Sequence, residues 1–390
     1  MEDVISNLLG HVEKHGAGAV LLAIAASTAS AQARSEIRGK PTCSSCRITL
    51  SLEATLRDTA PADDRQPSVI KRDGSGRFFL VRPSEGRDVP AVFDSSGRFL
   101  ARLGRPGAGP GEFRAARLVA FGPNDSSYLY DPANARLSVF SPKLRFVRSV
   151  PLPQFAFASG WAGDGHIAVS AAPTNPDRIG KPLHLVDGSG KVISSFGQDA
   201  GKPLPPGSEE MIYREITPAK GGGIWAADVW GRYRFQRFDA LGKLELEVIR
   251  RADWFPEGKL PRVTIRPDEP PFPSVAAMIE DVNGLVWVFI RVADRRWPEA
   301  LRPLQGSEEQ HRYEIVKTTH DIADIDLAYD TIIEVFDPAR KVLLATTRTD
   351  ELYRFSVGPN RVGRLRRTSD GSLIPEIWRV RLERGSAKHR

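Results

Sequence analysis

The chain of 390 residues contains only two cysteines, and it has no apolar run of the roughly 20 residues that a membrane-spanning helix requires. Two cysteines are too few for a disulfide-stapled scaffold. A net charge of +7 is spread along the chain without a block of like charges, which argues against a nucleic-acid partner. With 41% hydrophobic residues, 18 Phe and 7 Trp, the chain is too apolar to be disordered. We therefore expect a folded protein with a large core.

Residues 1–33 are predicted to be a signal peptide. A short apolar stretch at 17–26 is followed by small residues that end in Ala31-Gln32-Ala33, the A-x-A pattern of a cleavage site. The residues before the apolar stretch are acidic, which departs from the usual pattern; a start codon further downstream would remove this departure, and a buried N-terminal helix is the alternative interpretation. Cleavage after Ala33 predicts a periplasmic or secreted protein without a transmembrane segment.

The segment 34–47 carries both cysteines, Cys43 and Cys46, in a C-x-x-C spacing. A haem attachment site would need His at position 47, where Arg stands, and a zinc site would need a second pair of ligands. A thioredoxin-like redox pair would open a helix, whereas residues 48–52 alternate like a strand. In an oxidising compartment we expect a local disulfide that closes a very short loop and stabilises little.

A hairpin motif recurs in the rest of the chain. It joins an apolar pair, an Asp or other turn residue, a tight turn and a second apolar run, at residues 92–100, 139–147, 185–193, 237–244 and 335–343. Asp initiates such turns by bonding to its own backbone, and Gly adopts the positive φ that they require. A spacing of roughly 50 residues is typical of propeller blades. The last interval is about twice as long and predicts an insertion.

A second strand pair precedes each hairpin, so each repeat supplies four strands. We predict an all-β fold, a six-bladed β-propeller of four-stranded antiparallel blades, over residues 48–385, followed by a tail at 386–390. The expected blades are about 68–104, 112–153, 155–197, 212–250, 274–350 and 352–384. The last contains only three strands, and residues 48–56 would supply the fourth. Such an N-terminal strand would close the ring and remove free sheet edges.

Two segments carry a resemblance to a known family. Residues 103–113, Leu-Gly-Arg-Pro-Gly-Ala-Gly-Pro-Gly-Glu-Phe, resemble the Gly-rich connector of NHL repeats. Residues 128–140, Tyr-Leu-Tyr-Asp-Pro-Ala-Asn-Ala-Arg-Leu-Ser-Val-Phe, resemble the strand-Asp-Asn-Arg-strand centre of the same repeat. The chain as a whole resembles exported bacterial six-bladed propellers of the NHL or TolB-like kind.

The insertion, about 294–329, falls between the second and third strands of the fifth blade. It therefore shares a face with the turns after the second strands of blades two and four, and insertions on one face often mark a binding side. The candidate ligand-binding residues on this face are Asp131, Asn134, Arg136, Asp228, Trp230 and Arg232. A turn element inside the blade is the simpler interpretation of Asp131, Asn134 and Arg136. The acids of the insertion lack the pattern of an EF-hand loop.

These features favour an exported, monomeric binding or scaffold propeller, without a cofactor, that recognises a protein, peptide or glycan on the face with the insertion. Neither G-x-S-x-G nor H-E-x-x-H occurs, and no catalytic or metal-binding residue is assigned. The resemblance implies an alternative, a hydrolase or lyase that holds calcium or magnesium in the central channel, as in lactonases and streptogramin lyases. Asp131, Asp228 and Glu280 are its possible ligands. RNA binding, known for cytosolic NHL proteins, conflicts with the leader.

Overall fold

The structure is a computed structural model that describes residues 33–57, 66–82, 89–152, 156–171, 176–178, 180–198, 213–256, 267–303 and 320–385. The predicted signal peptide, apart from Ala33, and the tail at 386–390 lie outside these residues. No helix in the described ranges is long and apolar enough to cross a membrane.

The recurring turns form as their side chains dictate. Asp94 accepts hydrogen bonds from the amides of Ser96 and Arg98 at 2.9 and 3.0 Å, and Gly97 completes the turn with φ 89°. A Cβ at Gly97 would also lie 2.4 Å from a backbone oxygen of the closing strand. Asp187 accepts bonds from two amides in the same way. Each turn joins the two outer strands of a blade.

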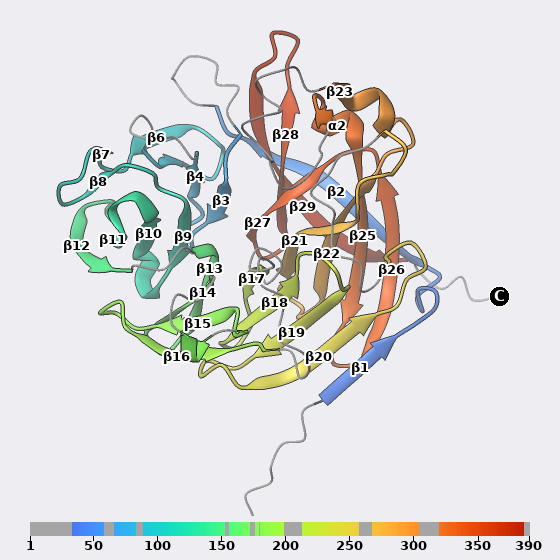
Figure 1. Cartoon of the computed structure of the whole chain (residues 1–390), viewed down its shortest axis with the longest axis horizontal. Helices are drawn as coiled ribbons and strands as arrows, with labels where there is room; N and C mark the ends of the chain where they lie inside the picture. The colour runs from blue at the N-terminus through green and yellow to red at the C-terminus, as the bar shows by residue number, and fades with distance from the viewer. Residues whose placement is uncertain are drawn as a thin grey trace, which may run out of the picture. The chain divides into compact units, whose positions relative to one another are not determined.

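Six four-stranded antiparallel sheets form the blades (Figure 1). The strands of blade 1 are β3 (Val69–Arg72), β4 (Phe78–Val81), β5 (Ala91–Phe93) and β6 (Phe99–Arg102). Those of blade 2 are β9 (Leu118–Phe121), β10 (Ser127–Asp131), β11 (Arg136–Phe140) and β12 (Phe146–Pro151). Those of blade 3 are β13 (Ala156–Gly163), β14 (His166–Ala171), β15 (Leu183–Val186) and β16 (Val192–Phe196).

The other three blades follow the same order from the inside outward. The strands of blade 4 are β17 (Arg214–Pro218), β18 (Ile224–Asp228), β19 (Arg234–Phe238) and β20 (Leu244–Arg250). Those of blade 5 are β21 (Ser274–Glu280), β22 (Val286–Ala293), β25 (Tyr329–Asp337) and β26 (Val342–Thr349). Those of blade 6 are β27 (Tyr353–Gly358), β28 (Arg361–Arg367), β29 (Leu373–Arg384) and β2 (Cys46–Thr55).

Short elements lie between these strands. The connector from blade 1 to blade 2 holds the paired strands β7 (Arg105–Pro106) and β8 (Glu112–Phe113). Single 3-10 turns are η1 (Pro123–Asp125), η2 (Pro132–Asn134) and η3 (Pro176–Arg178). The described part of the insertion holds η5 (Trp297–Ala300), β23 (Leu301–Pro303), β24 (His320–Ile322) and α2 (Ile325–Ala328).

The innermost strands close a ring. β3, β9, β13, β17, β21 and β27 each contact the next, and β27 contacts β3 again. Apolar side chains fill the space between neighbouring blades; Phe235 and Phe336, for example, pack with centroids 5.0 Å apart between blades 4 and 5. The predicted six-bladed propeller is confirmed.

The N-terminal strand completes blade 6, as predicted. β2 pairs antiparallel with β29, from Cys46 opposite Arg384 to Thr55 opposite Glu376. Ile48 and Leu50 of this strand pack on the core between blades 5 and 6. β2 is the outer strand of blade 6, and the other three strands of this blade are β27, β28 and β29. Backbone hydrogen bonds between an N-terminal and a C-terminal strand therefore close the ring.

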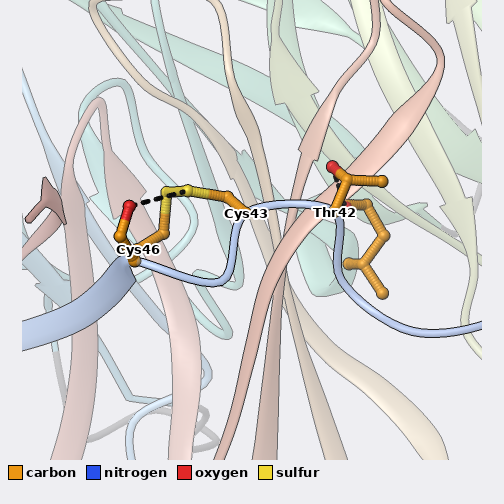
Figure 2. Close-up of a disulfide and its surroundings, with 5 residues drawn as sticks. Thr42, Cys43 and Cys46 are labelled. Atoms are coloured by element: carbon orange, nitrogen blue, oxygen red, sulfur yellow. Dashed lines mark hydrogen bonds between the residues drawn. A yellow bond between two sulfur atoms is a disulfide. The ribbon is translucent and has the colours of Figure 1, made fainter. Parts of the chain in front are cut away.

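The residues before β2 cross two further blades, which the sequence analysis did not predict. β1 (Ala33–Ile37) pairs parallel with β20 and adds a fifth strand to blade 4 (Figure 1). Further along, the amides of Thr42 and Cys43 donate to the carbonyls of Leu343 and Leu344 in blade 5, at 2.9 and 3.2 Å. Figure 2 shows the disulfide between Cys43 and Cys46 next to this contact. Residues 33–55, the N-terminal strap, thus bind blades 4, 5 and 6 in turn.

The turns inside the hairpins define one face of the ring, the hairpin face. Neighbouring turns bond to one another there: the amide of Gly74 donates to Asp125, and that of Val282 to Asn360. The connectors between blades and the loops between second and third strands lie on the opposite side, because strands alternate in direction. We call this side, which carries the insertion, the insertion face.

Candidate functional site

A channel runs along the axis of the ring. A cavity of about 240 Å³ occupies its hairpin end, lined by strands from all six blades, and a smaller one of about 70 Å³ lies next to it toward the insertion face. The two cavities share Lys71, Val119, Ser159 and Ser356. These four residues mark the middle of the channel.

Two opposite charges stand in the channel. Lys71 on β3 and Glu215 on β17 are each half-buried by area because they line the hollow channel, and protein surrounds them. Burial lowers the pKa of Lys71, and the charge of Glu215 opposes this shift. Burial raises the pKa of Glu215, opposed by the charge of Lys71 and by a hydrogen bond from Ser356. Desolvation therefore disfavours the charged form of each group, and the opposite charge of the other group compensates for this only in part.

The hydroxyl of Ser356 makes two hydrogen bonds. It donates to the Glu215 carboxylate and accepts from the amide of Met278 at 3.0 Å. Within the described residues, by contrast, no hydrogen bond or direct ion pair reaches the Lys71 ammonium, on which Glu215 acts only through its longer-range charge. A group with three N–H donors therefore faces the channel without a protein acceptor.

The insertion stands beside the other end of the channel. Arg354, which lines the smaller cavity, donates to Gln66 at 3.0 Å. Burial lowers the pKa of Arg354 to about 10; Asp326 of α2 opposes this shift, and Arg291 adds to it. Burial raises the pKa of the Asp326 carboxyl, with Arg354 again opposing. Ala328 of α2 shares a small apolar cluster with Leu352, which leads into the innermost strand β27, so α2 lies beside this end of the channel.

The acids of the insertion take separate structural roles. Asp324 caps α2, accepting from the amides of Asp326 and Leu327 at 3.1 and 3.2 Å. Asp330 bonds to Arg348 at 2.6 Å and shares a hydrogen bond with Asp294 across the base of the insertion. Burial is the main cause that raises the pKa of Asp330, and the neighbouring Asp294 carboxylate adds to this shift.

The blade 2 candidates hold the Gly-rich connector. Asp131 is fully buried and accepts hydrogen bonds from the amides of Arg114 and Ala115, at 2.8 and 3.1 Å, and from the Asn134 side chain at 2.7 Å. Asn134 donates to the carbonyl of Gly107 at 3.1 Å, and Arg136 donates to the carbonyls of three connector residues. The structure thus places these side chains in a turn element that fixes the chain beneath the insertion face.

The blade 4 candidates divide between interior and surface. Asp228 is buried and pairs with Arg214 at 2.8 Å and with Arg234 at 3.0 Å. Trp230, two residues further on, is half-buried against Tyr213, with ring centroids 6.0 Å apart, and Arg232 is exposed. Trp230 and Arg232 are therefore the candidates that offer surface to a ligand.

The channel residues do not suit a divalent ion. At mid-channel Glu215 is the carboxylate, and the ammonium of Lys71 would repel a cation there. Glu280 lines the hairpin end, where it accepts a hydrogen bond from the amide of Lys220 at 2.6 Å. Asp131 and Asp228 are bonded inside their own blades. Among the residues that the structure describes, no group of three or more His, Cys, Asp or Glu side chains could hold a metal ion.

Lys71, Glu215 and Arg354 were not among the residues predicted from the sequence. A signal exists in each case: a charged residue lies in the innermost strand of a blade, directly beside a core residue, as in Ile70-Lys71 and Glu215-Ile216. This position forces the side chain toward the axis, since the neighbouring side chain is in the core.

No protein-family model matches the chain, and no curated protein matches its sequence. Solved structures do resemble it. A protein of Bacteroides fragilis provisionally described as exported matches with a TM-score of 0.55 at 10% identity, over 90% of this chain and 99% of that one. A DUF4221 family member from Bacteroides vulgatus matches with a TM-score of 0.56 at 12% identity, over 86% and 99%.

Virginiamycin B lyase from Staphylococcus aureus matches more weakly, with a TM-score of 0.44 at 9% identity, over 85% of this chain and 99% of that one. A match at this level indicates nothing about the activity of this chain. At these identities the likeness to the two Bacteroides proteins shows the fold alone.

Proposed function

We propose that the chain is an exported, non-catalytic binding propeller of the NHL or TolB-like kind, which recognises a protein, peptide or glycan on its insertion face. The observation that carries the proposal is the surface around Trp230. A half-buried Trp packed on Tyr213, with the exposed Arg232 two residues away, offers a rigid aromatic platform and a guanidinium. Trp, Tyr and Arg are the residues that most often dominate binding energy at interfaces.

The neighbouring elements support the same location. Asp131 and Asp228 fix the backbone that carries the face from beneath, through buried hydrogen bonds and ion pairs. Ala300, Ala328 and Tyr329 of the insertion form a small core with Leu352, which precedes β27, and this core keeps α2 beside the channel. A preformed surface of this kind binds with little ordering cost.

Capture with the chain from Arg34 onward tests the proposal, using peptide and glycan arrays and extracts of the protein's own source. Replacing Trp230 by Ala should weaken binding of a captured partner by about 2 kcal/mol, the loss typical of an aromatic anchor. Trp161 is a matched control, because it packs on Tyr128 in a similar pair, 5.8 Å apart, on the hairpin face. Equal losses in both variants would remove the insertion face as the binding side.

The metal-dependent alternative is tested on the same material. We expect the melting temperature in calcium or magnesium to equal the melting temperature in EDTA. A site filled at about 100 times its dissociation constant would add about 2.7 kcal/mol of stability. A clear rise in melting temperature would therefore favour the hydrolase or lyase reading and disfavour the binding proposal.

A further inference from the structure

We propose a second, independent binding site in the hairpin end of the channel: it takes a small organic carboxylate, whose carboxylate contacts Lys71 and whose apolar body fills the cavity of about 240 Å³. This site lies at the opposite end of the channel from the insertion face. Different residues form the two sites, so a test of the channel site is independent of the proposed partner surface.

The charge at the inner end of this cavity calls for an anion. The Lys71 ammonium lines both cavities, and no described residue accepts a hydrogen bond from it. An ammonium surrounded by protein is costly unless an acceptor meets it. Ser159, which also lines both cavities, supplies a second donor: among the described residues its hydroxyl contacts the carbonyl of Val119, at 3.4 Å, which is beyond the usual range of an O–H···O bond.

The other charges around the cavity select a monoanion. Glu215 stands deeper in the channel and Glu280 at the hairpin end, so a phosphate dianion would meet repulsion from both sides. Arg72 at the same end lies among charges of both signs, Arg361 and Arg379 on the one hand and Glu53 and Asp73 on the other. One ammonium between two carboxylates therefore suits a singly charged carboxylate best.

The walls toward the hairpin face suit an apolar body. Phe121, Trp161, Pro218 and Val357 line the cavity on four different blades. Phe121 and Trp161 are held in place by packing, on Phe79 at 4.8 Å and on Tyr128 at 5.8 Å between ring centroids. A cavity with apolar walls and a few convergent polar groups at one end is the usual form of a small-molecule site.

Calorimetric titration of the chain from Arg34 tests the site, with phenylacetate and hexanoate as probes and phenylacetamide and hexanamide as their neutral counterparts. Trp161 gives a fluorescence signal for the same titration. We expect saturable binding of one molecule per chain, with each carboxylate at least about tenfold tighter than its amide, since the amide oxygen can still accept a hydrogen bond from the ammonium but carries no negative charge to pair with it.

Variants locate the contact. Lys71→Met should bring the carboxylates to the affinity of their amides, a loss of about ten- to a hundredfold, while Lys143→Met, an exposed lysine on the hairpin face, should change nothing. Trp161→Ala should weaken acids and amides alike. Retained preference for the acids in Lys71→Met, equal affinities in the wild type, or no saturable binding of any probe would overturn the proposal. Comparing the affinities of the wild-type protein for the acids and the amides tests the proposal even if a variant fails to fold.

Discussion

Replacing Asp131 by Ala tests whether this residue is a structural element or a ligand contact. The side chain is fully buried and accepts from the amides of Arg114 and Ala115 at 2.8 and 3.1 Å. Without the carboxylate the buried amide of Ala115 loses its partner, which costs about 1–3 kcal/mol, and the part-buried bond from the amide of Arg114 is lost as well. We therefore expect the free energy of unfolding to fall by about 2–4 kcal/mol in urea titrations followed by circular dichroism.

Asp187 is the matched control, because it also accepts from two amides, at 2.8 and 3.0 Å, but in an exposed hairpin turn. Water replaces the lost carboxylate there, so Asp187→Ala should reduce stability much less. Affinity for a partner of the insertion face should survive in Asp131→Ala under conditions where the variant is folded. An Asp131→Ala protein as stable as the wild type, with weakened partner binding, would refute this reasoning.

Three further changes have defined outcomes. Burial lowers the pKa of His184 to about 4, below its ordinary value of 6.5. Its contribution to the free energy of unfolding, about 3 kcal/mol, is therefore complete above pH 6.5 and is lost as the pH falls toward 4. Urea midpoints should fall over this pH range and fall less in His184→Gln, and an equal dependence of the midpoint on pH in both proteins would contradict this role of His184. Glu334→Gln breaks a buried pair with Arg250, 3.1 Å apart, and should cost about 3–5 kcal/mol in the same assay, whereas a wild-type midpoint would show that the pair is dispensable. Replacing Cys43 and Cys46 together by Ser opens a very short loop and should cost at most about 2 kcal/mol, so unfolding of this variant at 25 °C would contradict the minor role assigned to the disulfide.

The blades could be predicted from the sequence because their signals are local. A turn such as 94–98 is specified by Asp94 and Gly97 alone, whatever the rest of the chain does. The closing strand could be predicted by elimination, since the last blade has three strands of its own. No local signal predicts the pairing of β1 with β20. Ala33 pairs with Leu246, which lies far away in the chain, and this pairing depends on the path that the N-terminal strap takes across the blades.

The candidate site was harder to predict for a related reason. Asp131 and Asp228 stand out in the sequence because turn motifs surround them. Their carboxylates, however, are already bonded inside their own blades. Lys71 and Glu215 lie in ordinary strand sequence, and only the arrangement of the blades brings them to one channel. Spacing along the chain cannot report such a convergence, since the two side chains come from different repeats.

The pairing of β2 with β29 also sets the order in which this protein can be made. Residues 46–55 are synthesised early, but their partners at 376–384 come last. At the usual 5–20 residues per second, the interval is on the order of 15–70 s, during which β2 presents an unpaired strand edge. A chain that stops before residue 376 would keep that edge permanently and leave blade 6 incomplete. The ring can therefore close only once residues 376–384 are present, and premature termination even near the C-terminus should yield material prone to aggregation and proteolysis.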